Sequence, residues 1–278
     1  MPAGTDREMN RRADESMSQT DQAPVIVSLK NVRKEFENGT TALQDFSLEV
    51  RKGEFVSLLG PSGCGKSSAL RIIAGLAAPS GGDVAWPQEA HEQSGHELGF
   101  VFQEATLMPW ATVFSNVWLP LRIKGVSKSA ARERVMDALE TVGLQDFADH
   151  RPAELSGGMK MRVSIARALI TRPKVLLMDE PFAALDEITR FKLNNDLMHL
   201  QESFGWTVLF VTHSVFESVY LSSRVVVMAA RPGRVVCEHR IDMPRPRDDG
   251  FRTSQHYSDL CRDVSASLQA SMEPADAF

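Results

Sequence analysis

The stretch EFVSLLGPSGCGKSSALRIIAGLAA, residues 54–78, decides the fold of this chain. It opens with an apolar run typical of a buried strand, and apolar residues from Leu70 to Ala77 then recur with the spacing of a helix. Between the two, GPSGCGKS at residues 60–67 matches the phosphate-loop pattern G-x-x-x-x-G-K-[ST] in the strand–loop–helix context that the pattern requires. A glycine turn with a chance lysine is the alternative, which this context disfavours. The stretch therefore predicts an α/β fold with a phosphate-binding loop.

The residue types in this loop suit phosphate binding. Its glycines let backbone N–H groups surround the phosphates, Lys66 reaches the β- and γ-phosphates, and the Ser67 hydroxyl can ligate Mg²⁺. Cys64 is interpreted as a small filler residue, because phosphoryl transfer to water needs no thiol nucleophile. We therefore expect nucleotide contacts from the whole loop, that is from Gly60, Pro61, Ser62, Gly63, Cys64, Gly65, Lys66 and Ser67.

Apolar runs on both sides of the loop predict further strands. Downstream runs alternate with helical segments, which is typical of a mainly parallel sheet with helices on both faces. They lie at residues 98–103, 174–181, 206–213 and 224–230. Upstream, apolar and polar residues alternate from Val25 to Leu29 and again from Phe46 to Val50, on either side of a turn near Asn38-Gly39. The upstream segments predict a separate antiparallel part.

The order of these segments predicts three parts of the chain. Residues 1–23 are expected to form a disordered tail, residues 24–245 a domain, and residues 246–278 a C-terminal extension. Within the domain, residues from about 104 to 160 are expected to form a helical insertion.

Finer features are predicted within two of these parts. In the insertion, Val135, Leu139 and Val142 fit one face of a helix that Ser127 or Ser129 would cap. From Arg231 the chain is interpreted as loop-like until a last helical stretch near residues 257–268. The basic residues at 245 and 247 are interpreted as part of a solvated loop, with contact to lipid headgroups as the alternative.

The composition excludes several classes of protein. The 278 residues carry a net charge of −5, which argues against a protein that binds nucleic acid through general electrostatics. The three cysteines, Cys64, Cys237 and Cys261, form no metal-like cluster, and their odd number favours a reducing compartment. No apolar run approaches the about 18 residues of a membrane-spanning helix, and the N-terminus lacks the apolar core of a signal peptide. These features predict a cytoplasmic protein.

Two further groups of residues suggest chemistry. Asp179 and Glu180 end a buried strand, where Asp179 would hold Mg²⁺ and Glu180 would orient or deprotonate a water molecule. A helix cap is the alternative for such a pair of acids. Ser156, Gly157 and Gly158 precede a helix, and two interpretations stay open: an N-cap with a tight entry turn, or free backbone amides for an anion.

Five motifs in one order resemble those of the ATPase subunits of ABC transporters. They are the phosphate loop, LSGGM at 155–159, VLLMDEP at 175–181, ALD at 184–186 and VTH at 211–213, and the resemblance covers residues 25–245. Two strings, FQEATLMPW at 102–110 and DEPFAALD at 179–186, are most similar to the importer branch that serves nitrate, sulfonate and taurine. The fold that the resemblance implies is a P-loop NTPase with a mainly parallel sheet, an antiparallel β subdomain and an inserted helical subdomain.

The resemblance also implies roles for single residues. Ser156, Gly157 and Gly158 would bind the γ-phosphate of ATP held by the phosphate loop of a second copy, although Met159 stands where the family usually has glutamine. Asp186 would lie in the loop that crosses between the two copies. The remaining implied contacts are to Mg²⁺ or water from Gln103, to the γ-phosphate from His213, to the adenine ring from Phe36 and to the α-phosphate from Ser68.

The predicted function is that of an ATP-hydrolysing subunit of an importer for a small solute. Its cofactors would be ATP and Mg²⁺, and its catalytic residues Glu180, His213, Gln103 and Lys66. Its partners would be a second copy of itself, an integral membrane permease and, indirectly, a solute-binding protein, on the inner face of the cell membrane; nucleic acid is not expected. The alternatives are a soluble ABC ATPase that is not coupled to transport and a P-loop small-molecule kinase.

Overall fold

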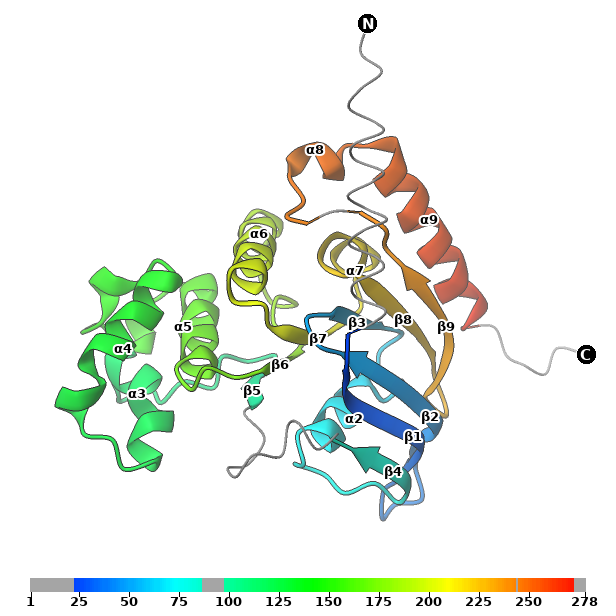
Figure 1. Cartoon of the computed structure of the whole chain (residues 1–278), viewed down its shortest axis with the longest axis horizontal. Coiled ribbons are helices and arrows are strands. Elements are labelled where there is room, and N and C mark those ends of the chain that lie inside the picture. Colours follow the sequence, from blue (N-terminus) through cyan, green and yellow to red (C-terminus); the bar gives the residue numbers. More distant parts are fainter. Residues whose placement is uncertain (1–22, 87–97, 244, 273–278) are drawn as a thin grey trace, which may run out of the picture.

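The computed structural model describes residues 23–86, 98–243 and 245–272, and within them the chain forms two sheets surrounded by helices (Figure 1). The larger sheet has the strand order β5-β6-β7-β3-β8-β9. All its neighbouring strands are parallel except β8 and β9, which are antiparallel. Its strands are β3 (Phe55–Leu59), β5 (Leu98–Val101), β6 (Val175–Asp179), β7 (Thr207–Thr212), β8 (Arg224–Ala229) and β9 (Arg234–Arg240).

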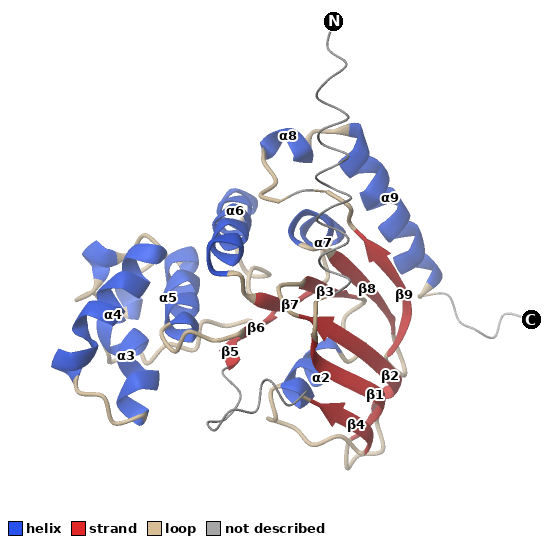
Figure 2. Cartoon of the chain, viewed as in Figure 1, coloured by secondary structure: helices blue, strands red, loops and turns tan. Residues whose placement is uncertain are grey.

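The smaller sheet is antiparallel and lies on the same side of the larger sheet as the helix that follows the phosphate loop (Figure 2). Its order is β2-β1-β4, with β1 (Val25–Glu35), β2 (Thr41–Arg51) and β4 (Gly81–Ala85). The predicted turn between the first two strands is present, with Gly39 in the left-handed region at φ 79°. The mainly parallel sheet and the separate antiparallel part are therefore confirmed.

The helices fall into three groups in Figure 1. Three stand together to one side of the sheets, namely α3 (Val113–Ile123), α4 (Lys128–Thr141) and α5 (Gly157–Leu169), with the short turns η2 (Gln145–Phe147) and η3 (Pro152–Glu154) between the last two. Four cover the other face of the larger sheet and its β9 edge, namely α6 (Glu187–Phe204), α7 (Val215–Leu221), α8 (Asp249–Arg252) and α9 (Gln255–Ala270). The remaining helix is α2 (Lys66–Ile73), between the two sheets.

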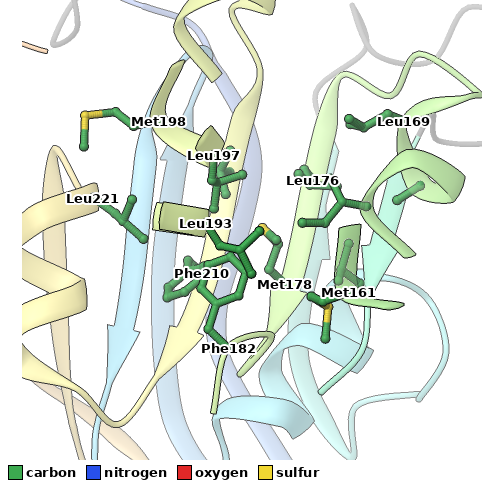
Figure 3. Close-up of a cluster of buried hydrophobic side chains, with 14 of the residues drawn as sticks. Met161, Leu169, Leu176, Met178, Phe182, Leu193, Leu197, Met198, Phe210 and Leu221 are labelled. Atoms are coloured by element: carbon green, nitrogen blue, oxygen red, sulfur yellow. The ribbon is translucent and has the colours of Figure 1, made fainter. Parts of the chain in front are cut away.

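Strand β6 shows why its sequence is apolar without interruption. Leu176 and Met178 belong to the core under α5 and α6, where Met178 lies near Phe182 and Phe210 in Figure 3. Leu177, between them, belongs to the other core, under α2 and the antiparallel sheet. Because successive side chains of a strand point to opposite faces, a strand covered on both faces needs apolar residues at every position.

Local predictions hold in the helical group. Ser127, and not Ser129, caps α4 by accepting a hydrogen bond from the backbone N–H of Ala130 at 3.3 Å. Helix α5 ends at Leu169, before Pro173, as the restriction on the residue preceding proline requires. The expected limits of the insertion and of the three parts of the chain stay predictions, and residues 1–22 lie outside the described part of the chain.

The prediction of a loop after Arg231 is wrong. Residues 234–240 form β9, whose half-buried residues Val235, Cys237 and His239 alternate with exposed ones. The solvated-loop interpretation also fails for Arg247, which is only 4% exposed and donates hydrogen bonds to the carbonyl oxygens of Val219 and Tyr220. These carbonyls replace water around the guanidinium group and thereby hold the C-terminal segment against α7.

Candidate functional site

The phosphate loop is shaped by its glycines. Gly63 and Gly65 both lie in the left-handed region, at φ 78° and 94°. At Gly65 a Cβ atom would also come within 2.6 Å of the carbonyl oxygen of Ala42, on β2. Both conditions exclude a larger residue, so the loop turns sharply from β3 into α2 and brings its backbone close to the antiparallel sheet.

Lys66 is the first residue of α2 and its side chain is folded into the loop. The side chain is 4% exposed, and its ammonium group donates hydrogen bonds to the carbonyl oxygens of Gly60 at 2.8 Å and Pro61 at 2.9 Å. The ammonium nitrogen also lies 3.7 Å from a carboxylate oxygen of Glu180. A positive charge is therefore held at the centre of the loop, where phosphate would bind.

Asp179 and Glu180 stand at the carboxyl end of β6. The Ser67 hydroxyl donates a hydrogen bond of 2.8 Å to Asp179, which links α2 to this strand. Burial raises the pKa of Asp179 above its ordinary value, against the opposing effect of the Ser67 hydrogen bond. Glu180 has a backbone φ of 45°, which is uncommon for a residue other than glycine and is typical of functional sites.

The carboxylate of Glu180 lies between two groups that carry or can carry positive charge. One of its oxygens is 3.0 Å from Nδ1 of His213, which follows β7, and the other is the one near Lys66. The His213 side chain is 55% exposed, whereas that of Glu180 is 18% exposed. Three neighbouring strands of the sheet, β3, β6 and β7, thus bring the predicted lysine, glutamate and histidine together at their carboxyl ends.

The oxygen atoms of Ser67 and Asp179 suit Mg²⁺, which prefers hard oxygen ligands. Among the described residues, no group of three or more His, Cys, Asp or Glu side chains could hold a metal ion.

The helix start at Ser156 has the geometry of the first of its two interpretations. The Ser156 hydroxyl accepts a hydrogen bond from the backbone N–H of Met159 at 3.3 Å and so caps α5. A Cβ atom on Gly158 would lie 2.6 Å from Cγ2 of Thr189, at the start of α6. Asp186 caps that same helix through the backbone N–H of Thr189 at 2.9 Å. Ser156 and Asp186, both exposed, therefore belong to one surface.

The remaining predicted residues are Gln103, Phe36 and Ser68. Gln103 is exposed just after β5, which pairs with β6, so it shares the edge of the sheet at which Asp179 stands. Phe36 is 46% exposed in the turn after β1, with the Lys34 ammonium 5.5 Å from its ring centre. Ser68 is half-buried on α2.

One residue that supports the loop was not predicted. Gly233, between β8 and β9, donates a backbone hydrogen bond of 3.1 Å to Ala42, and a Cβ atom there would lie 2.0 Å from the carbonyl oxygen of Cys64. The only local signal was the turn-forming pair Pro232-Gly233, which shows that a turn is present but not what it touches.

Comparisons with known proteins show the family to which the chain belongs. The family model described as "ABC transporter" matches residues 43–183. An uncharacterised ABC transporter ATP-binding protein of Methanocaldococcus jannaschii is 47% identical over 88% of this chain and 91% of its own length. The aliphatic sulfonates import ATP-binding protein SsuB 1 of Pseudomonas savastanoi pv. phaseolicola is 48% identical over 80% of this chain and 89% of its own.

A solved structure gives the same result for the fold. The dimeric, post-hydrolysis structure of the ATP-binding cassette MJ0796, bound to ADP and Pi, matches with a TM-score of 0.68 and 37% identity over 78% of this chain and 99% of that one. The predicted P-loop fold of an ABC ATPase is therefore confirmed.

Proposed function

Starting from the fact that the chain belongs to the ABC transporter family of ATP-binding proteins and is an ATPase, we propose that its hydrolysis of ATP drives solute import through a separate integral membrane permease. The proposed solute is a small organic anion of the sulfonate type. Support for it comes from the relative named for aliphatic sulfonate import and from the importer-like strings at 102–110 and 179–186.

We place the chain on the inner face of the cell membrane, with a solute-binding protein as an indirect partner. Among the described residues, no helix is long and apolar enough to cross a membrane.

The observation that carries the chemical part is the position of Glu180 between Lys66 and His213. In the proposed reaction Lys66 neutralises charge on the transferred phosphate, and Glu180 accepts the proton of the attacking water. His213 holds the Glu180 carboxylate in place and approaches the γ-phosphate. Gln103, at the same edge of the sheet, contacts the water or the metal.

Ser67 and Asp179 would hold Mg²⁺, which when bound neutralises the charge that develops on the β- and γ-phosphates. The hydrogen bond between the two residues already places both oxygens at one point. The backbone N–H groups of residues 60–67 would surround the phosphates, the Ser68 hydroxyl would reach the α-phosphate, and Phe36 would stack on the adenine ring.

The active unit we propose is a dimer of two copies of this chain. Ser156 and Gly157 are exposed at the start of α5, where a helix concentrates unpaired N–H groups and positive charge suited to an anion. Asp186 lies on the same surface through the contact of Gly158 with Thr189. A second copy would thus face this surface with its bound ATP. The solved dimeric cassette at 37% identity supports that arrangement.

Replacing Glu180 with glutamine tests the chemical part. The Glu180→Gln change removes the proton acceptor but keeps a side chain of the same shape, so we expect hydrolysis to fall at least about a hundredfold. ATP binding should persist, and dimers should accumulate with ATP in size-exclusion chromatography. Glu140→Gln, at an exposed position on α4, is the matched control and should hydrolyse ATP normally. Hydrolysis at the wild-type rate by Glu180→Gln would remove this residue from the role.

The transport part needs a separate experiment. The chain is purified by affinity from detergent-solubilised membranes of its own cell, and the proteins that stay bound are identified. Recovery of a protein with several membrane spans is expected. Repeated recovery of soluble partners alone, from a chain that still hydrolyses ATP, would instead favour an ABC ATPase that is not coupled to transport. Steady hydrolysis of ATP by the purified chain without a phosphate acceptor would argue against a small-molecule kinase.

A further inference from the structure

A pocket lies at the amino ends of the parallel strands of the larger sheet, whereas the candidate nucleotide site lies at their carboxyl ends. Its volume is about 1220 Å³, and its lining includes Lys174, just before β6, and Thr207, the first residue of β7. Asp179 stands at the other end of β6, five residues away, which at about 3.3 Å per residue is about 17 Å. The two sites are therefore separated by the length of the strands.

The walls of this pocket come from parts of the chain that are far apart in sequence. One wall is α4, through residues that include Arg134 and Ala138, and another is the end of α5 with Ile170. The antiparallel sheet contributes the start of β1. Pockets for small molecules are found preferentially at such boundaries between structural units, so its place in the fold is that of a ligand site.

The interior of the pocket suits a flat apolar group. Phe204 and Trp206 stack with ring centroids 4.7 Å apart and planes 6° from parallel. Phe204 is 55% exposed and Trp206 only 8%, so one outer ring covers an inner one and leaves a large apolar surface open to the pocket. Ile170 and Pro173 continue this surface. An aromatic ring system could lie against it with offset or edge contacts.

The rim of the pocket is positively charged. The described lining residues include four basic side chains and one acidic side chain, namely Lys52, Arg134, Arg172, Lys174 and Asp137. Arg134 donates a hydrogen bond of 2.9 Å to the carbonyl oxygen of Ile170, which keeps its guanidinium group at the wall of the pocket. Lys52 and Arg172 are exposed and also line the pocket. This excess of positive charge, in an otherwise acidic chain, favours an anion.

We propose that this pocket binds an amphipathic organic anion, with an aromatic or otherwise flat apolar body and a single sulfonate or carboxylate group. The apolar body would lie against Phe204, and the anionic group would face Arg172 and Lys52. This site is separate from the nucleotide site and does not depend on the proposed transport function. A nucleotide is a poorer fit, because an apolar pocket offers few partners for the several polar groups of a base and sugar.

The first test uses two fluorescent probes with the same aromatic skeleton and the full chain. The anionic probe is 8-anilinonaphthalene-1-sulfonate, and the neutral one is N-phenyl-1-naphthylamine, which lacks the sulfonate. We expect saturable binding of the anionic probe, about tenfold tighter than that of the neutral one, because a charge-assisted contact is worth about that factor. Equal affinity for both probes would overturn the anionic part of the proposal.

Variants locate the probe. Phe204→Ala and Arg172→Glu should each weaken binding of the anionic probe about tenfold. Lys52→Glu gives a second charge reversal should Arg172→Glu fold poorly. The matched controls are Phe216→Ala, an exposed aromatic residue on α7, and Lys192→Glu, an exposed lysine on α6, and both should bind as the wild type does. Unchanged affinity in all three pocket variants would overturn the proposal.

Adding ATP tests whether the anionic probe occupies this pocket or the nucleotide site. Saturating ATP should leave the fluorescence of the bound anionic probe unchanged, because the two sites lie at opposite ends of the strands. Displacement by ATP in the wild type, together with loss of that displacement in Lys66→Ala, would place the probe in the nucleotide site and overturn the assignment of this pocket.

Discussion

Two helices of this protein begin at glycines, and the two starts are built in opposite ways. At the start of α2 the glycines are required by backbone conformation, and Lys66 is folded inward onto the loop's own carbonyl groups. At the start of α5 neither glycine has a positive φ; the Ser156 hydroxyl caps the helix, and Gly158 is small because Thr189 presses against it.

The difference concerns which groups each start supplies by itself. The first has a buried cation, a hydroxyl and an adjacent carboxylate, which are groups suited to binding a nucleotide phosphate and its metal ion within one chain. The start of α5 has an exposed serine and exposed backbone, and its first basic side chain is that of Lys160, four residues after Ser156. It is suited to completing a site whose charge is supplied elsewhere. We infer that the first start binds nucleotide within one copy and that the second acts on the nucleotide of another.

Removing the cation of the first start should have the largest effect. Lys66→Ala deletes the only side chain of the loop that carries positive charge, and we expect ATP hydrolysis to fall at least about a hundredfold together with ATP affinity. Equilibrium binding of a fluorescent ATP analogue measures the affinity, and Lys192→Ala, exposed on α6, serves as the control. Normal nucleotide affinity in Lys66→Ala would contradict the role given to this start.

Removing the Ser156 hydroxyl at the start of α5 should leave nucleotide binding by a single copy of the chain intact. Ser156→Ala removes the cap, at a cost of about 1 kcal/mol in helix stability, and we expect hydrolysis to fall while ATP affinity stays unchanged. Mixing Ser156→Ala with Lys66→Ala gives the sharper measurement. A mixed dimer contains one site with an intact loop and an intact facing helix, so the mixture should hydrolyse ATP faster than either variant alone. A mixture no faster than the better variant, although mixed dimers form, would argue against the two-copy site.

Replacing Gly158 at the start of α5 with alanine tests whether this glycine is needed because of its contact with Thr189 or because of its backbone conformation. Gly158→Ala would place a Cβ atom 2.6 Å from Cγ2 of Thr189, and we expect a loss of about 1–3 kcal/mol in the free energy of unfolding. Gly157→Ala is the matched control, because its Cβ would lie 3.4 Å from the nearest atom, in Leu185. Urea unfolding measures both. Thr189→Ser removes the opposing methyl group and should restore most of the stability of Gly158→Ala; failure of that rescue would point to backbone conformation instead.

The smallest effect is expected from changing Cys64, whose thiol lies in the phosphate loop at the start of α2. Burial raises the pKa of Cys64, although the Lys66 ammonium opposes the shift. Because the thiolate is the reactive form, a raised pKa leaves less of it at neutral pH. Iodoacetamide should therefore modify buried Cys64 more slowly than half-exposed Cys237, with a rate that climbs as the pH rises toward and beyond the ordinary thiol pKa. Mass spectrometry follows both sites. Cys64→Ala should keep hydrolysis close to the wild-type rate, and a large loss would contradict the interpretation of Cys64 as a filler.

The parts of the site that the sequence predicted are those encoded locally. The phosphate loop and the acids at 179–180 each lie within a few consecutive residues next to a strand, so spacing alone was sufficient to find them. The cap of α4 was narrowed to Ser127 or Ser129 for the same reason, since an N-cap bonds to the backbone only two or three residues ahead, and the structure has Ser127.

The parts that escaped prediction depend on distant neighbours. Strand β9 is a half-exposed strand with polar Cys237 and His239 on its inner face, so it lacks the continuous apolar run of the buried strands. Arg247 is charged and would be exposed in most settings, and its burial depends on hydrogen bonds to carbonyl groups of α7 and of Ile241 and Met243. Gly233 is a turn residue whose contact partner in the phosphate loop, Cys64, lies far back in the sequence, before most of the domain has been passed. In each case the structure depends on residues that are distant in the sequence, and a local sequence pattern gives no information about them.

The place of β3 in the sheet has a consequence for how the protein is made. This strand leads into the phosphate loop, yet it pairs only with β7 and β8 among the described strands, and its Phe55 bonds to Ser223, 168 residues further along. At about 5–20 residues per second, the ribosome needs roughly ten to thirty seconds to synthesise that interval. Until β7 and then β8 have been made, the strand that leads into the loop has neither of its partner strands beside it. A growing chain therefore carries this apolar strand without its partners for much of its synthesis, and the part of the sheet that supports the phosphate loop is complete only after β8 has been made.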